Sequence, residues 1–359
     1  MSNREPAEPA GTAGPGSGAG GVPSAIALSP ILSARYRSGD LERIRAAAPG
    51  SRIVTMSVEG LSDDPVDDVE VLLHGWLSAD AFDRLLSRAP RLAWVHSASA
   101  GVERALTPAA RERGIVITNA RGVFSRPIAE YVMMMILAVR RKLPGLLELQ
   151  RERTWQPLEG GELRDVTVGI VGLGSIGRAV GALATAFGCR VIATRRRPEA
   201  TAQQDRDATA DEPSFGEAML DRVGGPETLP ALLAESDFVV LAAPLTPDTE
   251  EMIDAATLAL MKPGAWLINV ARGRLIDERA LIRALREGPL GGAVLDTFRD
   301  EPLAPTSPFY DLPNVIVTPH TSWSSARVLD RSVDLFCDNV RRYAAGEPLL
   351  NVVDPARGY

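Results

Sequence analysis

Residues 168–180 read VGIVGLGSIGRAV, an apolar run followed at once by a glycine-rich turn and the start of a helical pattern. The three glycines of this G-x-G-x-x-G spacing permit a tight turn, close approach of the backbone to a pyrophosphate, and close packing of helix on strand. A helix N-terminus at this point attracts anions. Because the motif lies between a strand and a helix, it predicts a Rossmann dinucleotide site more strongly than a merely tight turn. The predicted cofactor-binding residues of this turn are Gly172, Gly174, Ser175, Ile176 and Gly177.

Short apolar runs alternate with amphipathic helical patterns on both sides of the motif, which predicts βα repeats and parallel sheets. The runs that begin the first block are SRIVTM, VEVLLHG, LAWVHS and GIVIT. The block around the motif contains TVGIVG, RVIAT, DFVVLAA, AWLINV, GGAVLD and NVIVT. Six strands suit a complete dinucleotide-binding sheet.

The length of 359 residues predicts two domains. We expect the chain to divide into a disordered tail (1–24), the first part of a substrate domain (25–122), a Rossmann domain (123–320) and a C-terminal helix (321–359). The tail is rich in Gly, Ala, Pro and Ser and lacks the apolar segment of a signal peptide.

Three further segments have a predicted structure. A long helix is expected from Pro127 to about Gln150, because proline suits the first helical position. Another helix is expected over Ser325–Ala345. The polar stretch from Pro198 to Pro226 is interpreted as a surface insertion.

Composition excludes several classes of protein. Hydrophobic content of 45% and charged content of 24% are typical of a soluble globular chain. A net charge of −7 gives no general attraction to nucleic acid or anionic lipid, and the longest apolar run, Tyr131–Val139, is too short to span a bilayer. Cys189 and Cys337 show no CxxC spacing, so we expect no disulfide framework, no metal site and a cytoplasmic location.

The residues after RVIAT bear on the choice of cofactor. A fold selective for NAD usually has Asp or Glu at this point to bond the ribose 2′-hydroxyl. Here Arg195, Arg196 and Arg197 follow instead, of which Arg195 and Arg196 are the predicted cofactor contacts. Guanidinium groups bind a 2′-phosphate with charge-assisted hydrogen bonds. NADPH is therefore favoured over NADH, although the arginines could also form a solvated turn.

Charged side chains follow the last three apolar runs. Arg272 follows AWLINV, Asp296 and Glu301 follow GGAVL, and His320 follows NVIVT. Carboxyl ends of parallel strands meet at one edge, where such sheets place their chemistry. A 2-oxo acid needs a cation for its carboxylate and carbonyl oxygen, a proton donor and a hydride source, and Arg272, His320 and a dihydronicotinamide could supply these.

The chain resembles the D-isomer-specific 2-hydroxyacid dehydrogenase family from about residue 50 to its end. The matching strings are NARGVFSRPIAEYV (119–132), the glycine turn, LAAPLTPDT (241–249), MKPGAWLINVARG (261–273), GAVLDTFRDEP (292–302) and TPH (318–320).

The resemblance implies a role for each matching residue. Arg272 would bind and polarise the 2-oxo acid, and His320 would donate the proton while Glu301 hydrogen-bonds it. Asp296 would face the nicotinamide carboxamide. The other cofactor contacts implied are Ala243, Pro244 and Thr249.

The substrate side is expected in the first block. The small-residue turn SASAGVE can direct backbone N–H groups at an anion, and it resembles the family's carboxylate-binding loop, which implies that role for Ser99, Ala100 and Gly101. Trp76 could shape the side-chain pocket, though a tryptophan there is more often simply packed. The resemblance also implies a Rossmann domain inserted into a flavodoxin-like domain, and a homodimer.

The sequence leaves other functions open. A dinucleotide-sensing corepressor shares the fold and can keep the catalytic residues. Formate dehydrogenase would call for Gln at position 301, where Glu stands. A short phosphoglycerate dehydrogenase is also compatible with the sequence. The sequence does not identify the 2-oxo acid, because variable loops form the pocket for its side chain.

Overall fold

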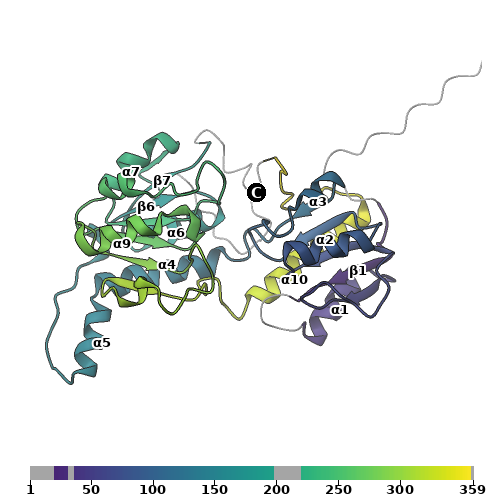
Figure 1. The fold of residues 1–359 in the computed structure, drawn as a ribbon, viewed down its shortest axis with the longest axis horizontal. Coiled ribbons are helices and arrows are strands. Elements are labelled where there is room, and N and C mark those ends of the chain that lie inside the picture. The colour runs from purple at the N-terminus through teal and green to yellow at the C-terminus, as the bar shows by residue number, and fades with distance from the viewer. Residues whose placement is uncertain (1–19, 31–35, 198–219, 357–359) are drawn as a thin grey trace, which may run out of the picture. The chain divides into compact units, whose positions relative to one another are not determined.

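The structure is a computed structural model that describes residues 20–30, 36–197 and 220–356 (Figure 1). Most of the predicted tail (1–19) and most of the predicted insertion (198–219) lie outside the described residues. The chain forms two compact units. The first unit joins the chain up to Ala120 to the chain from Ser332, and the second runs from Arg121 to Arg331.

The first unit contains a five-stranded parallel sheet. Its strands, in the order β2-β1-β3-β4-β5, are the flavodoxin-like arrangement. They are apolar because helices cover both faces of such a sheet. The bounds are β1 (Ala25–Leu28), β2 (Arg52–Thr55), β3 (Val69–His74), β4 (Trp94–Ser97) and β5 (Val116–Thr118), with α1 (Ser38–Ala47), α2 (Ala79–Arg88) and α3 (Pro108–Glu112). Ser78 caps α2 by accepting a hydrogen bond from the Ala81 N–H.

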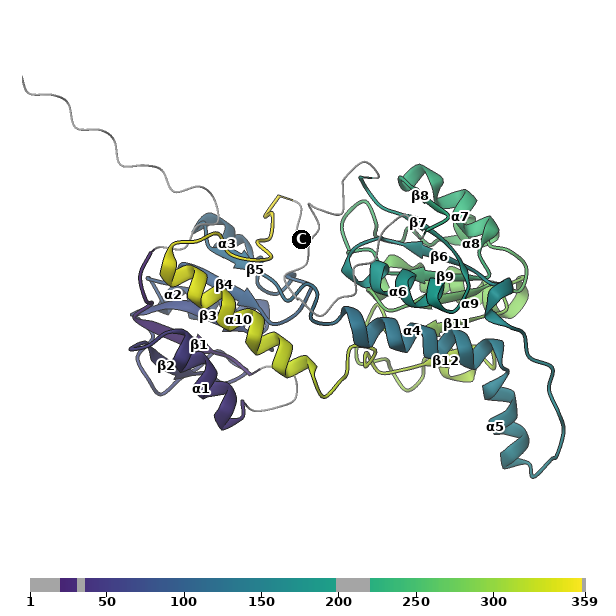
Figure 2. The ribbon, with the colours of Figure 1, turned by 180° about the vertical axis from the view of Figure 1, so that it is seen from behind.

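Helix α10 (Val328–Ala345) packs against this sheet through aromatic rings, and both ribbon views show it beside the strands (Figure 2). The ring of Trp94 on β4 lies 5.6 Å from Phe336 and 5.5 Å from Tyr343 on α10, measured between centroids. The final helix therefore supplies part of the first unit's core.

The second unit contains a seven-stranded parallel sheet in the order β12-β11-β10-β9-β6-β7-β8. Counted from β6, this is the Rossmann order 3-2-1-4-5-6 with one strand added at the far edge. The two predicted parallel α/β sheets are thus confirmed. The bounds are β6 (Thr167–Val171), β7 (Arg190–Thr194), β8 (Arg222–Gly224), β9 (Phe238–Leu241), β10 (Trp266–Asn269), β11 (Gly292–Leu295) and β12 (Val315–Val317).

The prediction of six strands in this sheet was wrong by one. Strand β8 falls within the stretch interpreted as a surface insertion, yet it pairs with β7 from Ile192↔Arg222 to Thr194↔Gly224. A three-residue edge strand with one apolar residue, Val223, gives no periodic signal in the sequence.

The single helix predicted from Pro127 to Gln150 was also wrong, because two helices occupy this segment: α4 (Ser125–Arg140) and α5 (Leu143–Arg151). Lys142 between them has a left-handed backbone, with φ of 58°. Pro144 cannot continue a helix from α4, because it lacks an N–H and its ring clashes with the carbonyl four residues earlier. Helix α5 has no buried residue and extends away from the sheet (Figure 1).

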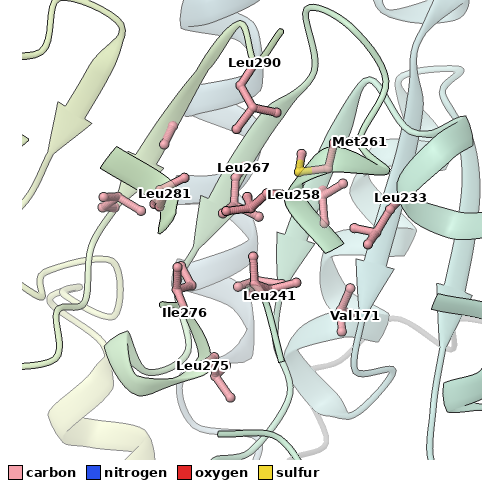
Figure 3. Close-up of a cluster of buried hydrophobic side chains, with 14 of the residues drawn as sticks. Val171, Leu233, Leu241, Leu258, Met261, Leu267, Leu275, Ile276, Leu281 and Leu290 are labelled. Carbon is pink, nitrogen blue, oxygen red and sulfur yellow. The ribbon is translucent and has the colours of Figure 1, made fainter. Parts of the chain in front are cut away.

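The other helices among the described residues of the second unit cover its sheet. They are α6 (Ser175–Ala186), α7 (Leu229–Glu235), α8 (Ala255–Ala259) and α9 (Glu278–Glu287), with short 3₁₀ turns η1 (Leu163–Asp165), η3 (Pro226–Thr228), η4 (Gly273–Leu275) and η5 (Pro308–Asp311). Leucine side chains from strands, helices and turns meet in one buried cluster (Figure 3). Leu275 and Ile276 belong to it, so the turn after β10 is anchored in the core.

Candidate active site

The glycine turn between β6 and α6 has room for a backbone and little else at two of its positions. At Gly172, where φ is +100°, a Cβ would lie 2.6 Å from the backbone nitrogen of Ala243 at the end of β9. At Gly177 a Cβ would lie 2.3 Å from the carbonyl oxygen of Gly172. A side chain at either position would push the strands and the helix apart.

Gly174 differs, because a Cβ there would meet nothing within 4 Å. It is the N-cap of α6, and the N–H groups of the first helical turn, including those of Ser175 and Ile176, have no acceptor within their helix. The turn follows β6, whose neighbour in the sheet is β9. The strand order reverses at this pair of strands, and such sheets bind their ligands there. The residues therefore fit the pyrophosphate of a dinucleotide.

Strand β9 ends at the same edge. Ala243 is buried behind Gly172, whereas Pro244 is exposed. The Thr249 hydroxyl donates to the Pro244 carbonyl at 2.7 Å and accepts from the Thr246 N–H at 2.8 Å. Thr249 thus folds the loop back on itself.

The arginines follow β7, beside the glycine turn. The N–H groups of Gly172 and Leu173 each donate to the Thr194 carbonyl at 3.0 Å, and the Arg195 N–H donates to the Gly224 carbonyl on β8 at 2.9 Å. Arg195 is partly buried and Arg196 is exposed. The unpredicted strand β8 therefore fixes the backbone from which the Arg195 side chain projects.

Arg272 follows β10 in a turn held by Asn269. The Asn269 side chain accepts from the Ala271 N–H at 3.0 Å and donates to the Arg272 carbonyl at 2.9 Å. A Cβ at Gly273 would lie 1.9 Å from the carbonyl carbon of Phe298. The Arg272 turn therefore packs directly on the loop that leads to Glu301.

Glu301 and His320 are hydrogen-bonded, as the resemblance implied: Nδ1 of His320 lies 2.8 Å from Oε2 of Glu301. The other oxygen, Oε1, accepts from the Phe298 N–H at 3.0 Å. Burial pulls the pKa of Glu301 upward, but the hydrogen bonds from His320 and Phe298 and the positive charges of His320 and Arg272 outweigh it, so that the pKa lies below its ordinary value. Glu301 is therefore a carboxylate at neutral pH.

His320 stands in a strained loop with φ of +51°, where side chains other than glycine are uncommon. Its N–H donates to the Thr318 carbonyl at 3.1 Å, and its carbonyl accepts from the indole N–H of Trp323 at 2.7 Å. Local hydrogen bonds on both sides thus hold the backbone that carries the imidazole.

Asp296, which is expected at the nicotinamide, is fully buried. Both of its oxygens accept hydrogen bonds from other residues of the protein. Oδ1 accepts from the Thr318 hydroxyl at 2.6 Å and from the Thr321 N–H at 2.8 Å, and Oδ2 accepts from the Ser322 N–H at 2.9 Å. In this structure Asp296 anchors the His320 loop.

The expected substrate residues belong to the first unit. The Ser99 hydroxyl donates to the Gly101 carbonyl at 2.6 Å, and the Asn119 amide donates to the Ala100 carbonyl at 2.9 Å. The Trp76 side chain is half exposed. The structure thus shows a fixed turn after β4, while Arg272, Glu301, His320 and the glycine turn all lie in the second unit.

Sequence reasoning missed several supporting residues. Thr318 stood inside the matching string TPH, next to His320, so its position was a signal that was not used. Tyr131, whose hydroxyl lies 2.6 Å from that of Thr318, is 187 residues away in the chain. It stood inside the matching string NARGVFSRPIAEYV, but nothing in that string pairs it with Thr318. Asn269 and Trp323 act through backbone contacts that no spacing reveals.

In the part of the chain that the structure describes, no helix combines the length and apolar character needed to cross a membrane. Within the same residues, His, Cys, Asp and Glu nowhere gather in a group of three or more that could hold a metal ion.

A Rossmann sheet, a glycine turn that fits a pyrophosphate and an imidazole–carboxylate pair at the same strand edge define a dinucleotide-dependent oxidoreductase. Residues 133–322 match the model of the D-isomer specific 2-hydroxyacid dehydrogenase NAD-binding domain. The chain belongs to the D-isomer-specific 2-hydroxyacid dehydrogenase family, whose members depend on NAD(P).

Individual relatives support this assignment. A glyoxylate reductase of Thermococcus gammatolerans is 33% identical over 79% of this chain and 81% of its own. A D-3-phosphoglycerate dehydrogenase of Mycobacterium tuberculosis is 34% identical over 87% of this chain, which spans only 57% of that relative's length. The crystal structure of a family member from Xanthobacter autotrophicus in complex with NADPH and MES is 30% identical, has a TM-score of 0.79, and covers 96% of this chain and 100% of its own.

Proposed function

We propose that this protein reduces a small 2-oxo acid to the D-2-hydroxy acid, with His320 as the proton donor. The 2.8 Å bond between Nδ1 of His320 and Glu301 carries the proposal, because it leaves Nε2 as the ring nitrogen that can give up a proton. A carboxylate beside an imidazole stabilises its protonated form. Arg272 lies on the turn that packs against the Glu301 loop. The cation Arg272, the proton donor His320 and the carboxylate Glu301 therefore lie at one edge of the sheet.

Each residue has a defined part in this reaction. When bound, the reduced nicotinamide supplies a hydride to the carbonyl carbon. Arg272 binds the substrate carboxylate and draws electron density toward the carbonyl oxygen, as a planar guanidinium can. His320 gives its Nε2 proton to that oxygen, so that the product leaves as a neutral alcohol, and Glu301 stabilises the imidazole in its charged state.

The turn after β4 is proposed to bind the substrate carboxylate through the backbone of Ser99, Ala100 and Gly101. Its internal hydrogen bonds hold the turn in place before any ligand binds, which lowers the entropic cost of binding. Trp76, with an exposed ring at the end of β3, is proposed to contact the variable part of the acid.

Steady-state assays test the reaction, each with NADPH and with NADH. The substrates are glyoxylate, hydroxypyruvate, phenylpyruvate, branched 2-oxo acids and 3-phosphohydroxypyruvate. Turnover of at least one acid, with the D-enantiomer as product, supports the proposal. Cofactor binding without turnover of any of them would favour the corepressor-like alternative, in which the dinucleotide acts as a signal.

NADPH is proposed as the preferred cofactor because Arg195 and Arg196 follow β7, where a carboxylate would repel a 2′-phosphate. We expect Arg195→Asp to raise KM for NADPH by about 10- to 100-fold, since a buried or half-buried charge-assisted contact is worth about 1.5–3 kcal/mol. KM for NADH should change little. Arg164→Asp, at an exposed arginine before the start of β6 and so at the opposite edge of the sheet, is the matched control. A wild-type protein that prefers NADH, or an unchanged ratio in Arg195→Asp, would contradict this preference.

A homodimer is proposed through α4, α5 and α6. Helix α5 buries none of its residues, and a groove of about 770 Å³ lies beside it. The groove is lined mainly by apolar side chains, among them Met133, Met134, Leu137, Leu143, Leu146 and Phe187. Helix α5 and this groove lie on one face of the unit. Across a two-fold axis, α5 of one copy and the groove of the other can bury each other's apolar side chains.

Light scattering tests this surface. The wild-type protein should have about twice the chain mass of 38.3 kDa, and Met134→Glu should shift it toward the monomer, because a charge would be buried unpaired. Leu260→Glu, at another exposed apolar position in the second unit, should leave the mass unchanged. A monomeric wild-type protein would refute the dimer.

A further inference from the structure

A row of hydrogen bonds links Tyr131, the partly buried Thr318 and Asp296 behind the loop that carries His320. The Tyr131 hydroxyl on α4 is 2.6 Å from Oγ1 of Thr318, and this atom is 2.6 Å from Oδ1 of Asp296. The Tyr131 side chain is 8% exposed and Asp296 is fully buried. The proposed reaction uses none of these three groups directly.

The hydrogen bonds that link Tyr131, Thr318 and Asp296 can run in only one direction. A carboxylate accepts hydrogen bonds, so the Thr318 hydroxyl gives its single proton to Asp296. Oγ1 of Thr318 can then only accept from Tyr131. Burial raises the pKa of Tyr131 to about 12, with the Asp296 charge adding to the rise and the Thr318 bond opposing it. The phenol therefore remains a donor throughout the neutral range.

Asp296 connects this row of hydrogen bonds to the residues on both sides of His320. Before His320, Thr318 bonds Asp296 through its hydroxyl, and its carbonyl accepts the His320 N–H at 3.1 Å. After His320, the Thr321 and Ser322 N–H groups donate to Asp296 at 2.8 and 2.9 Å. Since His320 itself has φ of +51°, its conformation persists only if the surroundings impose it.

We propose that Tyr131 is a positioning residue for His320: by donating to Thr318 it orients the hydroxyl that bonds Asp296, and Asp296 holds the loop so that the imidazole meets Glu301. The inference rests on the proposed function, since it assumes that His320 is the proton donor. It assigns a helix on the outside of the sheet a part in aligning the acid, without contact with substrate or cofactor.

Tyr131→Phe is the direct test, because it removes one oxygen and keeps the ring. We expect kcat for reduction to fall by about 2- to 12-fold, the range of a single net hydrogen bond in a network. KM for the cofactor and its affinity measured by fluorescence should stay within about twofold, a margin of less than half a kcal/mol. The basic limb of the pH–rate profile should move to lower pH, because the bond from His320 to Glu301 is less populated. Tyr310→Phe, at an exposed tyrosine of the same unit, should change none of these quantities.

A double-mutant cycle with Thr318→Val identifies the route. If Tyr131 acts through the Thr318 hydroxyl, Tyr131→Phe should have little further effect in the Thr318→Val background. Thr318→Ser keeps the hydroxyl and should retain the wild-type response to Tyr131→Phe. Additive losses in the cycle would overturn the proposed route.

A magnetic resonance titration gives a readout that does not depend on turnover. The chain has three histidines, of which His74 and His96 are buried, so the His320 ring signals can be assigned by comparison with His320→Gln. Tyr131→Phe should move the His320 titration midpoint to lower pH. An unchanged midpoint and kcat would overturn the inference, as would a loss of thermal stability and cofactor affinity with kcat retained. If the wild-type protein turns over no 2-oxo acid but Tyr131→Phe still shifts the His320 midpoint, the proposed function is refuted and the positioning role is supported.

Discussion

Replacing His320 with alanine is expected to lower kcat for reduction by about 10²- to 10⁴-fold, the usual contribution of a positioned general acid. The imidazole is the proton donor in the proposed reaction, and Nδ1 is already engaged by Glu301 at 2.8 Å. Cofactor affinity should survive, because the glycine turn and the β9 loop are untouched by the substitution. Steady-state kinetics and a fluorescence titration with the reduced cofactor measure the two quantities separately.

A companion variant isolates the charge of the partner. Glu301→Gln keeps an oxygen that can accept from Nδ1 but removes the negative charge, so it should cost less than the loss of His320 and should move the basic limb of the reduction profile to lower pH. Near-wild-type kcat in His320→Ala would show that another group donates the proton. Equal loss of cofactor affinity and of turnover would show that the substitution disturbs the fold.

The second large effect is expected at Arg272. Arg272→Ala should lower kcat/KM for the 2-oxo acid by about 30-fold to several thousand-fold, because removal of one partner from a buried charge pair costs about 2–5 kcal/mol. The loss should appear in both kcat and substrate KM, since the guanidinium holds the carboxylate and polarises the carbonyl. Arg272→Lys should recover only part of it, because an ammonium group lacks the planar, two-pronged geometry.

Arg274 provides the matched control, two residues along the same turn. Its side chain is exposed and pairs with Glu250 at 2.7 Å, and pairs of this kind contribute little. Arg274→Ala should therefore stay within about twofold of the wild type in kcat/KM. If the two variants behaved alike, the assignment of substrate binding to Arg272 would fail.

Much of the candidate site could be predicted because strand ends are visible in the sequence. The apolar runs before Gly172, Ala243, Arg272 and His320 mark parallel strands, and in a parallel sheet their carboxyl ends share one edge. The supporting contacts were invisible for an equally physical reason. The Asn269 amide that brackets the Arg272 turn makes its bonds to backbone groups, which every residue possesses.

Tertiary contacts also changed the meaning of individual residues. Asp296 stays predicted to face the cofactor, and both of its oxygens also accept bonds from the His320 loop, a role that the sequence pattern did not indicate. Lys142 looked like one more residue of a long helix, yet its left-handed backbone starts a second helix. In both cases the neighbours in space, and not the local pattern, determined the outcome.

The sequence by itself determined the two parallel sheets, the dinucleotide turn and the set of charged residues at the strand ends, because periodicity and glycine geometry are local properties of the chain. Only the tertiary structure determined how the acid is held. The contact of Gly273 with Phe298, the bond from the Thr321 N–H to Asp296 and the bond from Tyr131 to Thr318 join segments far apart in sequence. Such contacts form only when the sheet has assembled, since packing and not local preference brings those atoms together.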